Sequence, residues 1–144
     1  MTSQSQITSV VTLRVKPEDI DMYQHLTYSR YLEYFKNGGL ALMKESRVNL
    51  DELYSRNIGV VVTNTTIKYY REIKENEEVQ IHSNFLPYMG DGFFEISHEM
   101  RNNRGLIATC TDRNLFVKFN GKPIPIPIPR ELETLIAELE GGEQ

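Results

Sequence analysis

The sequence lacks several features that would assign a protein class at once. Tryptophan is absent, cysteine occurs once, and no apolar run approaches the eighteen or so residues that a membrane-spanning helix needs. A single thiol builds no disulfide framework, so a disulfide-stapled secreted scaffold is excluded. The 144 residues, 40% of them hydrophobic, predict one globular domain with a buried core.

Clusters of basic residues are also lacking. Sixteen Lys and Arg stand against twenty Asp and Glu, giving a formal net charge of −4, and no basic run marks a nucleic-acid partner. The segment Met1–Gln6 is polar and has none of the sections of a secretory signal, so we expect a cytoplasmic protein without a membrane partner. The domain is predicted to span residues 1–144, with residues 1–6 and 141–144 as tails.

Hydrophobic periodicity is what the sequence does contain, and it predicts a strand followed by a helix. Apolar residues alternate from Ile7 to Val15, and Pro17 ends the strand. From Thr27, the predicted N-cap, the period becomes that of a helix. The Gly38-Gly39 pair in this helix predicts close approach by another backbone or a ligand. The predicted apolar stripe comprises Tyr28, Tyr31, Leu32, Phe35, Gly39, Leu42 and Met43.

The rest of the chain reads as a strand meander. A helical turn over 50–56 precedes a long strand over 58–70, and turns at 90–92 and 102–105 separate three further strands. Alternating prolines make 123–129 extended, and 130–140 reads as a last amphipathic helix. The predicted fold is α+β: a five-stranded antiparallel sheet wrapped around one long helix. Its sheet edges favour pairing of two chains.

Titratable residues concentrate between the first strand and the long helix, in the segment 19–28. A carboxylate here lies near the free N–H groups and the positive dipole end of the helix, where a carbonyl can also be polarised as an oxyanion forms. Composition alone favours structural roles, in which Asp19 and Asp21 only cap turns and His25 is a packed loop histidine.

The amino-acid sequence of this segment resembles that of a known family. The letters DIDMYQHLTYSRYLEYF are similar to the first motif of the hotdog-fold thioesterases of the 4-hydroxybenzoyl-CoA thioesterase group. IKYYREI followed by ENEEV resembles that family's second strand end and turn, and GKPIPIPIPREL resembles its closing phrase. The resemblance covers nearly the whole chain in the right order. It implies a single hotdog domain.

A second likeness is to the catalytic half of the plant acyl-carrier-protein thioesterases. Carried over residue by residue, Asp21, His25 and Glu72 match proposed catalytic positions of those enzymes. Their catalytic Asn is replaced by Tyr23, and their Cys by Ile73. The Gly of many bacterial relatives is Gln24 here, and Thr27 replaces an Asn of the motif.

The resemblance implies a hydrolase of acyl-CoA or acyl-carrier-protein thioesters that needs no cofactor and no metal. Asp21 would be general base or nucleophile, and His25 and Glu72 would orient the water or Asp21. Tyr31 and Phe35 would flank the acyl chain. Substrate-binding residues implied with them are Tyr23, Gln24 and Thr27. The family builds its pocket between two subunits, which implies a homodimer and allows a dimer of dimers.

Two rival functions remain open. The fold also hosts acyl dehydratases, whose Asp and His arrangement we do not find in the sequence. A non-catalytic acyl-thioester sensor is the second rival, because Tyr23 and Thr27 depart from the hydrolase pattern.

Other reactive side chains favour structural roles. His82 falls on the polar face of its strand and His98 on the apolar face, so we expect a solvated surface residue and a satisfied core residue. Cys110 lies in a strand and is predicted to be a small buried hydrophobe. Arg71, Lys68 and Lys74 have the charge to attract coenzyme phosphates, but Lys and Arg scattered at a strand end are more often simply solvated.

Overall fold

The computed structural model describes residues 8–141. The predicted tails and Ile7 therefore lie wholly or partly outside the described residues. The strands are β1 (Thr8–Arg14), β2 (Ile58–Tyr69), β3 (Glu78–Phe85), β4 (Phe93–Asn102), β5 (Gly105–Phe119) and β6 (Pro123–Pro125). The helices are a 3-10 turn, η2 (Pro17–Asp19), and α1 (Tyr28–Glu45), α2 (Leu50–Ser55) and α3 (Arg130–Gly141).

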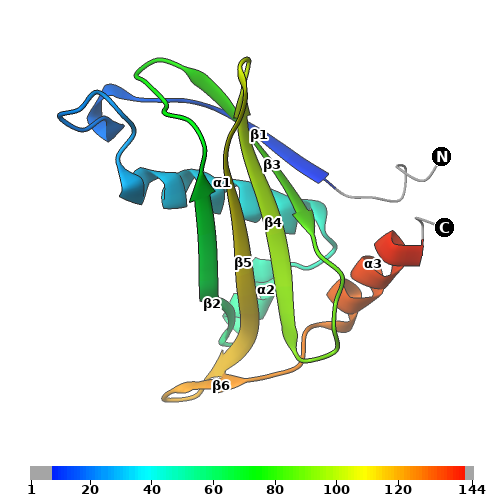
Figure 1. Ribbon diagram of the computed structural model, residues 1–144. Helices are drawn as coiled ribbons and strands as arrows, with labels where there is room; N and C mark the ends of the chain where they lie inside the picture. Colours follow the sequence, from blue (N-terminus) through cyan, green and yellow to red (C-terminus); the bar gives the residue numbers. More distant parts are fainter. Residues whose placement is uncertain (1–7, 142–144) are drawn as a thin grey trace.

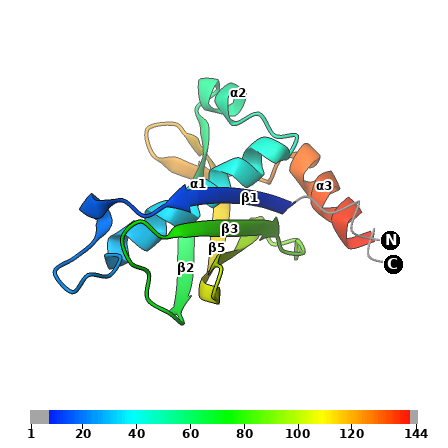
Figure 2. The ribbon, with the colours of Figure 1, turned by 90° about the horizontal axis from the view of Figure 1, so that it is seen from above.

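One antiparallel sheet in the order β1-β3-β4-β5-β2 carries the fold (Figure 1). The long helix α1 lies against β1, β3 and β4 (Figure 2). The predicted α+β arrangement of a sheet on one long helix is confirmed, with one correction: the sheet has six strands instead of five. The sixth, β6, pairs with the end of β5, because β4 pairs with β5 only as far as Leu115 and leaves that edge free.

Alternation along the strands places the core as the sequence predicts. In β1, Ser9 is buried between exposed neighbours, and in β4 the buried side chains are Phe94, Ile96, His98 and Met100. Buried residues form two clusters along α1, one around Tyr31, Phe35 and the β3–β5 strands, the other around Leu42, Met43 and α3. None of the helices in residues 8–141 is long and apolar enough to cross a membrane.

The predicted stripe of α1 is partly wrong. Tyr28 is 77% exposed and Leu32 is 49% exposed, whereas Tyr34 and Gly38 are buried. The buried stripe is therefore rotated relative to the prediction, because α1 covers β1, β3 and β4 and leaves its other flank open.

Gly38 does allow a close approach, but the approaching atoms belong to side chains. A Cβ at this position would lie 2.6 Å from Ile81 Cγ2 and 2.7 Å from Ser83 Oγ. At Gly39 the nearest atom, His98 Cε1, would be 3.6 Å away, an ordinary contact. Only the first glycine is required by the packing of α1 on β3.

Candidate active site

The loop between β1 and α1 holds Asp21 in a tight turn. Asp21 Oδ1 accepts hydrogen bonds from the backbone N–H groups of Tyr23 (2.8 Å) and His25 (3.3 Å). The Asp21 N–H donates to the carbonyl of His25 at 2.9 Å, and Ile20 and Leu26 form a bridge behind it. Oδ2 of Asp21 accepts no hydrogen bond from any described residue, so this oxygen is available to a bound molecule.

Gln24 occupies the position at which many bacterial relatives carry Gly, and its φ of 70° explains that preference. This left-handed region is open to glycine at little steric cost and strained for most other residues. The turn is thus formed with a side chain at its tip, and that side chain is exposed.

The start of α1 is held by Asp19, not by a capping side chain. Thr27 occupies the N-cap position as predicted, but its side chain makes no capping hydrogen bond. Asp19 is buried. Its Oδ2 accepts a hydrogen bond from Tyr34 Oη at 2.8 Å, and its Oδ1 forms an ion pair with Arg30 Nε at 3.2 Å. Burial and this hydrogen bond raise the pKa of Tyr34. No side chain caps the first turn of α1, and of its N–H groups that of Arg30 donates to the carbonyl of Thr27 at 2.9 Å. The N–H groups of Tyr28 and Ser29 are therefore the ones open to an oxyanion.

Glu72 follows the C-terminal end of β2, and its side chain contacts this loop. Its Oε2 contacts Nε2 of His25, and both side chains are partly exposed. The neighbouring backbone fixes the two segments together, because the N–H of Leu26 donates to the carbonyl of Ile73 at 3.1 Å. Asp21, His25 and Glu72, predicted together from motifs far apart in the sequence, are brought to one place.

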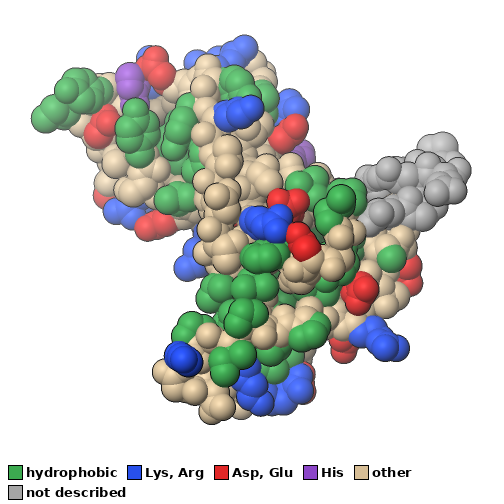
Figure 3. Space-filling view, turned by 60° about the horizontal axis from the view of Figure 1, so that its bottom comes forward, with side chains coloured by type: hydrophobic (Ala, Val, Ile, Leu, Met, Phe, Trp, Pro, Cys, Tyr) green, Lys and Arg blue, Asp and Glu red, His purple; other side chains and the backbone are tan. Residues whose placement is uncertain are grey.

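A cavity of about 580 Å³ lies at this junction. Figure 3 shows hydrophobic, acidic and histidine side chains together at the left-hand end of the molecule, the end at which the 20–27 loop lies in Figure 1. Six of the predicted site residues line the cavity: Asp21, Tyr23, His25, Thr27, Tyr31 and Glu72.

The cavity also has lining residues that sequence reasoning did not assign to it: Leu26, Tyr28, Tyr69, Tyr70 and Arg71. Tyr69 packs edge-to-face on Tyr31 with ring centroids 4.9 Å apart, and Tyr28 lies 5.6 Å from Tyr69. Burial, with Tyr69 and Glu72 nearby, raises the pKa of Tyr31 to about 12, so its hydroxyl stays protonated. The signal for Tyr69 was the YYREI motif itself, in which Glu72 received a catalytic role and Arg71 was considered only as a charge for coenzyme phosphates.

An adjoining cavity of about 540 Å³ contains Gln24 and shares Tyr23, His25, Arg71 and Glu72 with the first. Lys74 and Arg104 complete its lining. With Arg71, three cationic side chains therefore line this cavity. Arg104 is paired with Glu77 at 3.0 Å, whereas no ion pair of Arg71 or Lys74 occurs within residues 8–141. Lys68 lines neither cavity.

Phe35 lies elsewhere, in the core. It is 1% exposed, lines neither of these cavities, and packs with its ring 5.6 Å from that of His98.

His98 and Cys110 are buried as predicted, and burial with Asp112 nearby raises the pKa of the Cys110 thiol. His82 is half-buried and lies 3.2 Å from Gln80 Oε1. What the sequence did not indicate is that His98, Cys110 and Asp112 converge, with one ligand atom of each within 4.8 Å of the others. They come from neighbouring strands, and only the sheet register brings them together.

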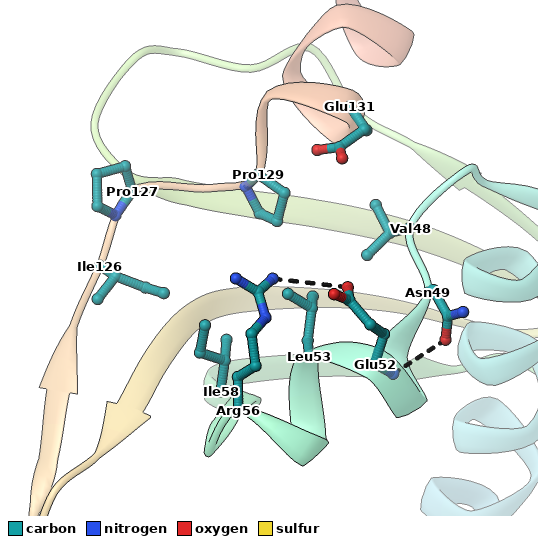
Figure 4. Close-up of a pocket in the computed structure, with 10 residues that line it drawn as sticks. All are labelled: Val48, Asn49, Glu52, Leu53, Arg56, Ile58, Ile126, Pro127, Pro129 and Glu131. Atoms are coloured by element: carbon teal, nitrogen blue, oxygen red, sulfur yellow. Dashed lines mark hydrogen bonds and ion pairs between the residues drawn. The ribbon is translucent and has the colours of Figure 1, made fainter.

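A further cavity of about 230 Å³ lies between α2 and the 126–131 segment (Figure 4). Leu53 and Pro129 contribute apolar walls, and Glu52 pairs with Arg56 at 3.6 Å. None of the predicted site residues lines it.

Comparison with solved structures shows the same fold in thioesterases. A 1,4-dihydroxy-2-naphthoyl-CoA thioesterase from Synechocystis matches with a TM-score of 0.79 and 12% identity, over 92% of this chain and 98% of that one. A DHNA-CoA thioesterase from Staphylococcus aureus matches with a TM-score of 0.84 and 16% identity, over 93% of this chain and 91% of that one. The 12:0-ACP thioesterase from Umbellularia californica matches with a TM-score of 0.78 and 12% identity, over 94% of this chain and 51% of that one.

A sequence search of curated proteins finds no match. The model of the Thioesterase-like superfamily, by contrast, matches residues 15–136, which include both cavities and all three predicted catalytic residues. The chain therefore belongs to the thioesterase-like superfamily and has the hotdog fold.

Proposed function

We propose that the protein is a thioester hydrolase that releases a carboxylic acid from an acyl-CoA or an acyl-carrier protein. The observation that carries the proposal is the convergence of Asp21, His25 and Glu72 on one cavity beside the start of α1. Family membership supports thioester chemistry in general.

Asp21 has the free oxygen that a general base or a nucleophile needs. Its Oδ1 is held by two backbone N–H groups, which fixes the carboxylate and leaves Oδ2 without a hydrogen bond from the described residues. As general base it takes a proton from water, and the hydroxide adds to the thioester carbonyl. As nucleophile it forms the acyl-enzyme anhydride that water then hydrolyses. In both schemes the carbon–sulfur bond breaks and the thiolate leaves.

The start of α1 and the His25–Glu72 pair take supporting roles. Free N–H groups of the first helical turn stabilise the oxyanion that develops on the carbonyl. His25 and Glu72 orient the water or Asp21. Tyr28, Tyr31 and Tyr69 offer an aromatic wall to the acyl group.

A homodimer is part of the proposal, and the edge strand β2 supports it. Val60 pairs with buried Phe116 and Val62 pairs with buried Asn114, so both valines are on the core face of the sheet. They are nevertheless 36% and 58% exposed, because α1 does not reach them. A second copy covers this face and the exposed flank of α1 around Leu32. The proposal allows a dimer of dimers.

The test is release of free thiol from a panel of acyl-CoA and acyl-carrier-protein thioesters that differ in chain length and aromaticity. A hydrolase releases thiol from some of them in multiple turnovers. Saturable binding of the thioesters with no release from any of them contradicts hydrolysis and indicates the sensor instead.

A further inference from the structure

A buried cluster of four side chains lies in the sheet, apart from the candidate active site. His98 on β4 lies opposite Cys110 on β5, and Ser83 on β3 lies opposite His98. Asp112 is two residues beyond Cys110 on the same face. Ser83 and His98 are fully buried, Cys110 is 1% exposed, and the Asp112 side chain is 18% exposed.

The donors point toward one another at distances close to those of a metal site. His98 Nε2 lies 3.0 Å from Asp112 Oδ2, and Cys110 Sγ lies 3.6 Å from Asp112 Oδ1. Nitrogen, sulfur and oxygen ligands placed tetrahedrally at zinc bond lengths stand about 3.4–3.6 Å apart. One ligand atom from each residue already lies within 4.8 Å of the others, so side-chain shifts of about 1 Å suffice.

Neighbouring residues hold these donors as outer-shell residues do in metal sites. Ser83 Oγ lies 2.7 Å from Nδ1 of His98, the ring nitrogen that faces away from Asp112. Thr65 Oγ1 donates to Asp112 Oδ1 at 2.9 Å and leaves Oδ2 toward the imidazole. Such partners fix the ring orientation of a histidine ligand and the direction of a carboxylate ligand.

Charge also favours a cation. Among the described residues Asp112 has no Lys or Arg partner, and the imidazole of His98 is the one basic side chain that contacts it. A carboxylate on the core face of a sheet needs a compensating charge. Within the cluster the Asp112 carboxylate is the most exposed group, and Thr65, opposite it on β2, is exposed.

We propose that His98, Cys110 and Asp112 form a binding site for a divalent transition ion of the zinc class, with Ser83 and Thr65 as its outer shell. Three protein ligands leave a fourth coordination position, on the side of Asp112. On binding, the Nε2 lone pair of His98 binds the ion, and the imidazole proton moves to Nδ1, which then donates to Ser83. The S–H bond of Cys110 breaks, its electron pair forms the sulfur–metal bond, and one proton leaves to solvent. The site is independent of the proposed hydrolase activity.

Cobalt(II) is a sharp probe because the chain has one cysteine. The full-length chain is stripped with a chelator and titrated with Co²⁺ while the thiolate-to-cobalt charge-transfer band is recorded. We expect this band to saturate at one equivalent, to be abolished by one equivalent of Zn²⁺, and to report Cys110 alone. Cys110→Ser should abolish the band, and a melting curve like that of the stripped wild type shows that the variant folds.

Two further variants separate this site from adventitious binding. Ser83→Ala should weaken the affinity by about 10–100-fold while the band persists at saturation. His82→Gln changes a histidine outside the cluster and should leave the titration unchanged. A folded wild-type chain that shows no charge-transfer band, or cobalt binding equally tight in Cys110→Ser, overturns the proposal.

Discussion

His25 Nε2 contacts Oε2 of Glu72, and this contact joins the loop before α1 to the loop after β2. The whole of α1, α2 and β2 separates the two residues in the chain. Because both side chains are partly exposed, the contact contributes little to stability, and its importance lies in the position that it gives to the imidazole and the carboxylate beside Asp21.

Replacing Glu72 with Gln tests this role. If the carboxylate orients the attacking water through the transition state, Glu72→Gln should lower kcat tenfold or more and leave KM nearly unchanged. Steady-state thiol release over a range of thioester concentrations measures both constants.

Glu75→Gln is the matched control, because Glu75 is an exposed glutamate of the same loop and lines neither cavity. It should keep the wild-type rate. If Glu72→Gln also keeps it, Glu72 is a surface residue and Asp21 with His25 must account for the reaction.

Asp21→Asn removes the base or nucleophile and keeps the turn. The amide oxygen of Asn can still accept the two backbone hydrogen bonds that Asp21 Oδ1 accepts. Turnover should therefore fall by about 10²–10⁴-fold while the melting temperature changes little. Thiol release and thermal unfolding on the same preparation give the two values.

The neighbouring exposed Glu18 supplies the control for Asp21. Glu18→Gln also removes one negative charge close to the loop but changes no residue of the cavity. Near-normal turnover in Asp21→Asn would reject the assignment of Asp21 and shift the hypothesis to Glu72 or to the sensor.

Local pattern explains which parts of the fold were predictable from the sequence. Alternation in β1 and β4 and the long apolar period after Thr27 are short-range signals, and those elements were confirmed with boundaries shifted by one or two residues. The exposure of Tyr28 and Leu32 was not predictable, because helix periodicity gives the apolar positions and not the strands that cover them. Pairing of β6 depends on a free stretch of β5, which is a property of the assembled sheet.

The same distinction applies to the sites. The motifs around Asp21 and Glu72 lie at element ends, and a family resemblance located them. His98, Cys110 and Asp112 carry no motif spacing and meet because of the register between β4 and β5. A shift of that register by one residue would turn Cys110 to the other face of the sheet.

The Gly38-Gly39 pair allows a stability test with an internal control. Gly38→Ala places a methyl 2.6 Å from Ile81 Cγ2, a clash that should cost about 1–3 kcal/mol and outweigh the helix-propensity gain of about 1 kcal/mol. Gly39→Ala meets only an ordinary contact at 3.6 Å and should stabilise by up to about 1 kcal/mol. Urea unfolding of both variants measures the difference, and equal free energies of unfolding would contradict the packing described for α1 on β3.

Val62 tests the proposed dimer and the part that the second copy plays in the active site. Wild-type protein should sediment at micromolar concentration with no appreciable monomer, since the core face of β2 and the edge of that strand need a cover. A lysine at position 62 brings a charge into the covered face, so Val62→Lys should produce monomer. If the pocket is built from two chains, thiol release should fall as the dimer of Val62→Lys dissociates. Val10→Lys is the matched control, because Val10 is similarly exposed, at 51%, but alternates with buried Ser9 and thus faces away from the core. It should stay dimeric and active.

A folded wild-type monomer with full activity would refute the dimer, and a fully active monomer of Val62→Lys would show that one chain completes the pocket by itself.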